Sequence, residues 1–339
     1  MTNATVFKIH SSAKYSPDII TGTHYEIGYL VGAKHAAQVR ETVQNHQNLH
    51  LKMRPFLRQP DGYSRFQEFI DVHERMYPDY LKELKGMADG SGTRFEDLFL
   101  INLRGEYLPF DQQDAGGGCS TVTIVNRDRQ IIGHNEDAAA DYRDKLFFLS
   151  VKPETGVSWT ALCYPGVLSG NAAGWNECGI FFTINITAPR HIRVGPGRYF
   201  AARSLLQATS LDDAIKRVTL PGRASGFNYT IADSKTSRVI NVEVTDTQHH
   251  IKPIDGYYFH TNHYFELSGI DQLTTRSSKF RLIRGRHHIA RTPPKNVSDI
   301  LHILHDNKYI FRQATELHDT ATLITLVCEL HNQAVHVFC

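Results

Sequence analysis

The feature that most constrains the fold is an abrupt change of pattern at residues 118–119. Before it, apolar residues return every three or four positions, as in "GTHYEIGYLVGAKHAAQVRETVQNHQNLHLKM", which is typical of amphipathic helices. After it, segments such as "CSTVTIVN" alternate apolar with polar residues and are rich in β-branched types, which is typical of strands. Helices followed by strands, with a further helical stretch over residues 198–218 and a last one near residues 297–306, predict an α+β protein with helices packed on antiparallel sheets.

This boundary also predicts how the chain is divided. Residues 1–118 form a mostly helical N-terminal segment, and residues 119–339 form a core that begins with the hairpin "CSTVTIVN", "RDRQ", "IIGHN". No repeat and no low-complexity linker separates the two parts. We therefore expect them to build one folded domain, for which 339 residues supply a full core.

Charge and cysteine content exclude several classes of function. Lysine and arginine number 37 and aspartate and glutamate 35, so no large field attracts nucleic acid or an anionic membrane. No run of 18 apolar residues suggests a membrane span, and the N-terminus lacks the apolar core of a signal peptide. The five cysteines (Cys119, Cys163, Cys178, Cys328, Cys339) are odd in number and scattered, so we expect reduced thiols and a cytoplasmic protein.

The sequence "DAGGGCSTV" places Cys119 directly after three glycines, at the start of the first predicted strand. Taken alone, this is most simply a glycine turn that enters a strand. It also suits a site of self-cleavage, because glycine reaches backbone conformations in which a sulfur can approach the preceding carbonyl. Cleavage before Cys119 would expose an α-amino group with a pKa of about 7.7–8.0, so that one residue supplies both nucleophile and base.

Seven segments resemble, in order, one known family. They are "GTHYEIGYLVG", "YPDYLKELKGMADG", "NLRGEY", "GCSTVTIVN", "GHNEDA", "LCYPGVLSGNAAGWNECGIFFTIN" and "FHTNHY". Each is weak alone, but their ordered series over most of the chain resembles the N-terminal-nucleophile amide hydrolases related to isopenicillin N acyltransferase and to the insect β-alanyl-dopamine hydrolases of the Tan type. The resemblance implies a four-layer αββα sandwich with the cysteine at the tip of a central strand.

The same resemblance implies roles for individual residues. Cys119 matches the nucleophile, and the chain is expected to cleave itself between Gly118 and Cys119. Asn262 in "HTNH" matches the asparagine that helps to hold the oxyanion, and Asp137 in "HNED" matches an acidic residue that holds the α-amino group or a neighbouring arginine. Arg312 in "YIFRQ" is the expected counterpart of a late arginine. After cleavage, residues 1–118 and 119–339 are expected to stay associated as two fragments.

Two residues of "HNED" are expected to bind substrate. Glu136 stands where Tan-type enzymes carry glutamate, so its carboxylate would pair with the amine of a β-alanyl chain if it faces the pocket; the alternative is an outward-facing strand position. Asn135 is the second expected contact, with a role in supporting the hairpin. The resemblance thus predicts a cysteine amidase that hydrolyses or transacylates a small N-acyl amide, such as β-alanyl-dopamine, through a thioester on Cys119.

Three alternative functions remain open at this point. The chain could be an acyl-CoA-dependent N-acyltransferase of the penicillin type, or an unprocessed thiol hydrolase that uses Cys119 with His134 or His260. It could also be a non-catalytic binding protein with the same fold. No organic cofactor is expected, and no metal, since the two histidines of "HTNH" lack a third ligand at a convincing spacing.

Overall fold

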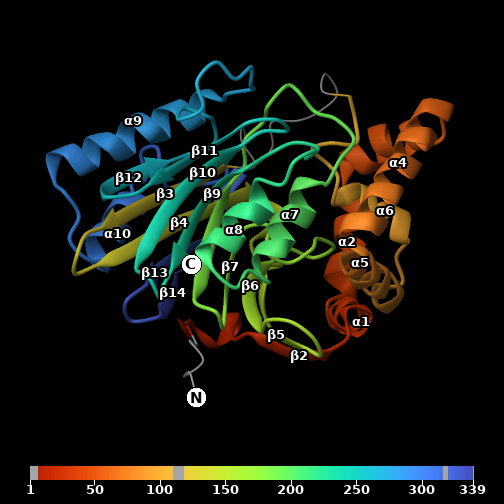
Figure 1. Ribbon diagram of the computed structural model, residues 1–339, viewed down its shortest axis with the longest axis horizontal. Helices are drawn as coiled ribbons and strands as arrows, with labels where there is room; N and C mark the ends of the chain where they lie inside the picture. The colour runs from red at the N-terminus through yellow and green to blue at the C-terminus, as the bar shows by residue number, and fades with distance from the viewer. Residues whose placement is uncertain (1–6, 110–117, 316–319, 339) are drawn as a thin grey trace.

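The computed structural model describes residues 7–109, 118–315 and 320–338. Two β-sheets lie face to face at its centre (Figure 1). Within the described residues, the first sheet has six strands, in the order β1 (Lys8–His10), β14 (Ala334–Phe338), β13 (Thr320–Glu329), β4 (Gln130–Ala139), β3 (Gly118–Val125) and β12 (Gly256–His260). The predicted hairpin is β3–β4, in which Cys119 pairs with Glu136 and Thr121 with His134.

The second sheet has eight strands within the same described ranges. Their order is β11 (His249–Pro253), β10 (Arg238–Val244), β9 (Asn228–Asp233), β8 (Ile180–Asn185), β7 (Ala173–Asn176), β6 (Trp159–Cys163), β5 (Phe147–Pro153) and β2 (Asp18–Gly22). All neighbours pair antiparallel except β2 with β5. Sequence periodicity predicts most of these strands, but not the short β1, β2, β7 and β11.

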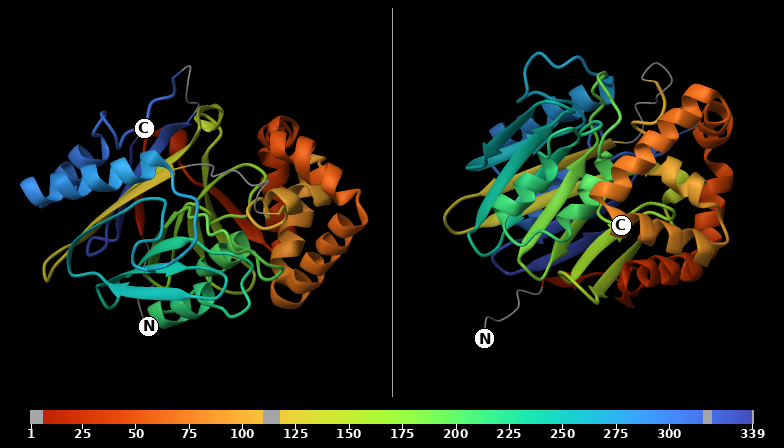
Figure 2. Two further views of the ribbon diagram at one scale, coloured as in Figure 1. Left: turned by 90° about the horizontal axis from the view of Figure 1, so that it is seen from above. Right: turned by 45° about the vertical axis from the view of Figure 1, so that its right-hand side comes forward.

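Helices cover both outer faces of the sheet pair (Figures 1 and 2). Helices α9 (Arg276–Arg291) and α10 (Val297–Leu304) lie on the six-stranded sheet, and α7 (Arg198–Leu205) and α8 (Leu211–Val218) lie on the eight-stranded sheet. The predicted α+β fold, with its αββα layers and helical N-terminal segment, is confirmed. Among the described residues, no helix has the length and hydrophobicity needed to cross a bilayer.

The N-terminal helices pack beside the eight-stranded sheet (Figure 1). They are α1 (His24–Lys34), α2 (Ala36–Asn45), the π-helical turn η2 (Leu49–Met53), α3 (Arg54–Leu57), α4 (Pro60–Met76), α5 (Pro78–Ser91) and α6 (Phe95–Ile101). Thr23 and Glu26 form a capping box that starts α1. Helices α1 and α5 cross so closely that a Cβ atom at Gly28 would lie 1.9 Å from the carbonyl oxygen of Glu83, which explains the glycine in "YEIG".

The N-terminal segment is built into the same core as the rest of the chain. Strand β1 pairs with β14 in one sheet, and β2 pairs with β5 in the other. The side chain of Asn102, at the end of α6, donates to the carbonyl oxygen of Gly166 and accepts from the backbone N–H of Leu168. A buried ion pair of 2.9 Å joins Glu83 in α5 to Arg203 in α7. Residues 7–109 therefore contact both sheets and the helix layer beyond them.

Candidate active site

Cys119 is held by its backbone at the start of β3. Its N–H donates to Oδ1 of Asn262 at 2.8 Å, and its carbonyl oxygen accepts from Nη1 of Arg281 at 2.5 Å. Strands β4 and β12 flank it on either side, and its side chain is buried. Three separate elements, β12, α9 and β4, therefore fix the position of one residue.

Asn262 follows β12 and presents its amide oxygen to Cys119. The same Oδ1 accepts from Nη2 of Arg281 at 2.7 Å, and Nδ2 donates to the carbonyl oxygen of Ile186 at 3.0 Å. Because a guanidinium only donates, the bond from Arg281 fixes which end of the amide faces Cys119. The expected oxyanion donor thus contacts the nitrogen of Cys119 through its oxygen, and one of the two hydrogens on Nδ2 is left over.

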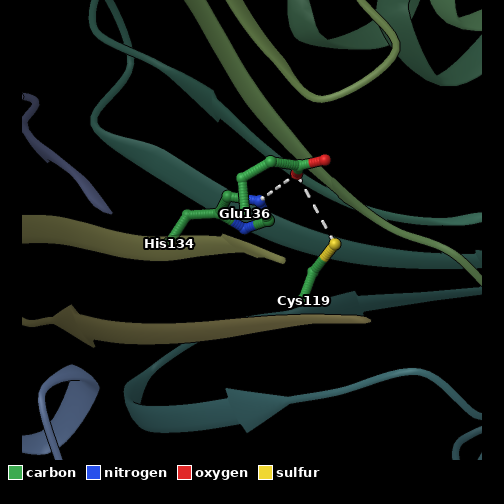
Figure 3. Close-up of side chains that lie close together, drawn as sticks. All are labelled: Cys119, His134 and Glu136. Carbon is green, nitrogen blue, oxygen red and sulfur yellow. Dashed lines mark hydrogen bonds and ion pairs between the residues drawn. The ribbon is translucent and has the colours of Figure 1, made fainter. Parts of the chain in front are cut away.

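The sulfur of Cys119 faces a buried polar cluster between the sheets (Figure 3). Oε2 of Glu136 lies 3.5 Å from Sγ and 3.1 Å from Nε2 of His134, and Oε1 accepts from the hydroxyl of Tyr164 at 2.6 Å. Burial raises the pKa of the Cys119 thiol well above its ordinary value, and the charges of Glu136 and Asp137 raise it further. The thiol is therefore protonated in this environment, and its S–H faces Oε2 of Glu136.

The opposite face of β4 carries a second charged group around Gly118. A Cβ atom at Gly118 would lie 2.9 Å from Nη1 of Arg312, 3.2 Å from Nη2 of Arg281 and 3.4 Å from Oδ2 of Asp137. Oδ1 of Asp137 accepts from the hydroxyl of Thr322 at 2.7 Å. Burial raises the pKa of Asp137 to about 6, although the charge of Arg281 opposes this shift. Asp137 and Arg312 thus meet at the residue that precedes Cys119.

Asn135 lies away from this group. Its Nδ2 donates to the carbonyl oxygen of Leu304 in α10 at 2.8 Å, and its Oδ1 accepts from the hydroxyl of Thr325 in β13 at 2.8 Å. Side chains alternate along a strand, so Asn135 and Asp137 point to the helix layer while His134 and Glu136 point between the sheets. The expected substrate contact at Asn135 is not supported; the residue joins β4 to its neighbours.

A cavity of about 490 Å³ opens beside the cluster. Glu136, Asp137 and Asn262 line it on the Cys119 side, and Arg104 and Tyr164 are among the residues that complete its wall. This volume suits a small organic molecule. Polar and charged groups at the wall next to Cys119 favour a polar substrate over a hydrocarbon chain.

Comparison with known proteins identifies the family. Residues 125–338 match the model of the acyl-coenzyme A:6-aminopenicillanic acid acyl-transferase family, which is more than half of the chain. The chain belongs to this family. A relative in Drosophila melanogaster, named β-alanyl-dopamine/carcinine hydrolase, is 27% identical over 315 residues, which cover 84% of this chain and 81% of the relative. The predicted family membership is confirmed, and the family contains amide hydrolases and acyltransferases.

A solved structure of the Caenorhabditis elegans N-acylethanolamine-hydrolyzing acid amidase ortholog is also similar. The match covers 63% of this chain and 93% of the other, with 10% identity and a TM-score of 0.45.

The sequence did not point to two residues that contact the buried cluster of Cys119, His134 and Glu136. Arg281 is fully buried and bonds Cys119, Ser120 and Asn262. The available signal was helical spacing, because Arg281 shares the buried face of α9 with Ser278, Leu282 and Gly285. Tyr164 follows β6, and nothing in its local sequence indicates that it reaches Glu136.

The histidines proposed as partners of Cys119 take other contacts. Nδ1 of His260 contacts the carbonyl oxygen of Thr261 at 2.7 Å, and Nε2 contacts Glu243 at 3.0 Å, so both ring nitrogens are occupied. His134 bonds Glu136 rather than the sulfur. The geometry of this family member therefore disfavours a direct Cys–His pair.

Proposed function

We propose that this protein is a self-processing cysteine amidase that hydrolyses small N-acyl amides. The observation that carries the proposal is the placement of Cys119, whose backbone nitrogen lies 2.8 Å from Oδ1 of Asn262 and whose sulfur lies 3.5 Å from the carboxylate of Glu136, beside a substrate-sized cavity. The nucleophilic sulfur and the groups that can accept its proton are thus brought together around Cys119.

Processing precedes activity in this proposal. Glu136 accepts the thiol proton, and the sulfur of Cys119 attacks the carbonyl carbon of Gly118. The Gly118–Cys119 C–N bond breaks, the nitrogen takes the proton, and a thioester forms. Water then hydrolyses the thioester, which leaves a carboxylate on Gly118 and frees the thiol of Cys119 beside the α-amino group already released. The guanidinium groups of Arg281 and Arg312, which lie next to Gly118, favour the negative charge that develops there.

Turnover uses the amine that processing exposes. The α-amino group of Cys119, with an ordinary pKa of about 7.7–8.0, is held by Oδ1 of Asn262 and takes the thiol proton. The sulfur attacks the substrate carbonyl, and the second hydrogen on Nδ2 of Asn262 stabilises the oxyanion. The leaving amine takes the proton, and water hydrolyses the acyl thioester.

The two fragments remain one molecule after cleavage in this proposal. Strands β1 and β2 from the first fragment are hydrogen-bonded into the two sheets of the second, and Glu83 pairs with Arg203 across the same division. Separating the fragments would leave Glu83 and Arg203 each without its partner, which is costly in free energy.

The substrate class follows from Glu136. Among the residues the structure describes, its ionisable hydrogen-bond partners are His134, Cys119 and Tyr164, and no lysine or arginine pairs with it. A buried carboxylate at the cavity wall favours an acyl chain that ends in a primary amine. We therefore propose β-alanyl amides as substrates, which agrees with the name of the Drosophila melanogaster relative.

Intact-mass measurement tests processing, and a panel of amides tests turnover. The wild-type chain should give fragments of roughly one third and two thirds of its mass, with the larger one starting at Cys119, whereas Cys119→Ala stays whole and inactive. Dopamine and histamine amides of β-alanine are compared with the matching butanoyl amides, with and without acyl-CoA. An active Cys119→Ala protein would refute the proposal, and acylation that requires acyl-CoA would favour the acyltransferase.

A further inference from the structure

Three side chains of the Cys119 cluster form a set of metal ligands. Sγ of Cys119, a ring nitrogen of His134 and a carboxylate oxygen of Glu136 all lie within 4.8 Å of one another, and all three residues are buried (Figure 3). Thiolate, imidazole and carboxylate are the three side-chain donors that zinc takes in proteins. No helix or strand alone provides the set: Cys119 comes from β3, and the other two alternate along β4.

Two of the three ligand separations match tetrahedral zinc, and the third, between the sulfur of Cys119 and the ring nitrogen of His134, is below 4.8 Å. With Zn–S of about 2.3 Å and Zn–O and Zn–N of about 2.0 Å, a tetrahedral ion separates oxygen from sulfur by about 3.5 Å and oxygen from nitrogen by about 3.3 Å. In the structure, Oε2 of Glu136 lies 3.5 Å from Sγ of Cys119 and 3.1 Å from Nε2 of His134. An ion could therefore bind with side-chain movements of a few tenths of an ångström along these two edges.

The surrounding hydrogen bonds orient the ligands. The hydroxyl of Thr121 donates to Oδ1 of Asn185 at 2.9 Å, so it accepts from Nδ1–H of His134, which lies 2.8 Å away. The lone pair of Nε2 is thereby aimed at Oε2 of Glu136. Two such atoms 3.1 Å apart need a cation between them, either a proton or a metal ion. Tyr164 holds the other carboxylate oxygen, as an outer partner of a metal ligand does.

Replacing protons by a zinc ion leaves the net charge of the buried site unchanged. A bound Zn²⁺ displaces two protons, one from the thiol of Cys119 and one shared between His134 and Glu136. The net charge of the buried group is the same before and after, so no uncompensated charge is buried. Glu136 lines the cavity, which gives the ion a path from solvent and leaves the fourth position for water.

We propose that Cys119, His134 and Glu136 bind Zn²⁺, or another thiophilic divalent cation, and that the bound ion reversibly blocks the sulfur. The ion acts as an inhibitor and not as a cofactor, because the sulfur it holds is the nucleophile. Binding is independent of the proposed function, and only the inhibition rests on it.

Metal titration of the purified full chain tests the proposal. Cys178 and Cys339 are first replaced by serine, which removes one partly exposed thiol and the C-terminal one. Zn²⁺ content after equilibrium dialysis should reach one ion per chain, and Co²⁺ should give a thiolate-to-metal charge-transfer band. Zn²⁺ should also protect Cys119 from alkylation and abolish amidase activity until a chelator is added.

Variants locate the site. Each of Cys119→Ala, His134→Gln and Glu136→Gln should weaken Zn²⁺ binding by at least about 10–100-fold, and the outer-partner variant Thr121→Val by about 10–100-fold. The matched control is Cys163→Ala, a buried thiol whose contacts are Ser169 and a backbone carbonyl. Circular dichroism selects the variants that keep the fold.

The metal site and the proposed amidase function can be refuted independently of each other. The metal site would be overturned if the folded ligand variants bound Zn²⁺ as tightly as the parent, or if Cys163→Ala lost as much affinity for Zn²⁺ as they do. This holds whatever the amidase activity. One ion per chain, lost in the ligand variants, supports the site even if no amide is hydrolysed, and that result would count against the proposed function alone. An active enzyme that binds no Zn²⁺ would overturn the metal site alone.

Discussion

Asp137 makes the stability of this protein depend on pH in an unusual direction. Its carboxyl group is almost fully buried, and burial raises its pKa from 3.8 to about 6. A group whose pKa is raised by folding contributes stability that is fully present below the unfolded pKa and is lost as pH rises through the folded pKa. The contribution of Asp137 should therefore fall between pH 4 and pH 6, where ordinary paired carboxylates contribute more with rising pH.

The magnitude follows from the shift. A displacement of roughly two pH units at about 1.4 kcal/mol per unit corresponds to about 3 kcal/mol. Asp137→Asn removes the titration but keeps an oxygen that can accept from Thr322. Any packing cost of the substitution is the same at both ends of the pH range, so only the pH-dependent part of the difference reports on the carboxyl group.

Urea unfolding from pH 4 to pH 7 measures this difference. Both proteins carry Cys119→Ala, so that each stays a single chain, and the free energy of unfolding is obtained by linear extrapolation. Relative to Asp137→Asn, the parent should lose about 3 kcal/mol of stability between pH 4 and pH 7. Asp89→Asn is a flat control in this range: hydrogen bonds from Lys85 and Tyr25 lower the pKa of Asp89, so its contribution changes below pH 4 and should stay nearly constant from pH 4 to pH 7. Parallel pH profiles for the parent and Asp137→Asn would refute the reasoning.

Three further predictions concern the contacts of Cys119. Glu136→Gln, measured on processed enzyme because Glu136 also takes part in the proposed cleavage, should lower the preference for β-alanyl over butanoyl amides by about 10–150-fold, since a charged hydrogen bond contributes about 1.5–3 kcal/mol; equal losses on both substrates would contradict amine recognition. Asn262→Ala should lower kcat by about 10²–10³-fold at nearly unchanged KM, measured on processed enzyme, and a pure KM effect would remove Asn262 from the oxyanion site. Arg281→Lys should slow processing, followed by intact mass, because one ammonium cannot reach the oxygens of Cys119, Ser120 and Asn262 together. Processing at the parental rate would show that these bonds do not matter for cleavage.

Local sequence predicted much of the architecture. Periodicity located the longer helices and strands, and the break at residues 118–119 coincides with the start of β3. Periodicity did not predict β1, β2, β7 and β11, each of three to five residues. A segment this short shows too few alternations of apolar and polar residues to be distinguished from a loop. Strands of this kind exist because neighbouring strands supply their hydrogen bonds.

The candidate site, like the fold, could be predicted only in part from the sequence. The sequence singled out Cys119 by its place after three glycines at the start of a strand, and it singled out Asp137, Glu136 and Asn262 through the family resemblance of their motifs. Strand alternation also required that Glu136 and Asp137 point in opposite directions, but it left open which one faces the sulfur. The tertiary structure decided that Glu136 does.

Only the tertiary structure brought Arg281 to Cys119, 162 residues away along the chain. It also turned the oxygen of Asn262, rather than its nitrogen, toward the backbone of Cys119. The physical reason is that residue type and periodicity specify what a side chain can donate or accept and which face of its element it occupies. Which partner meets that face depends on how the layers pack, and in this protein that packing set α9 against the start of β3.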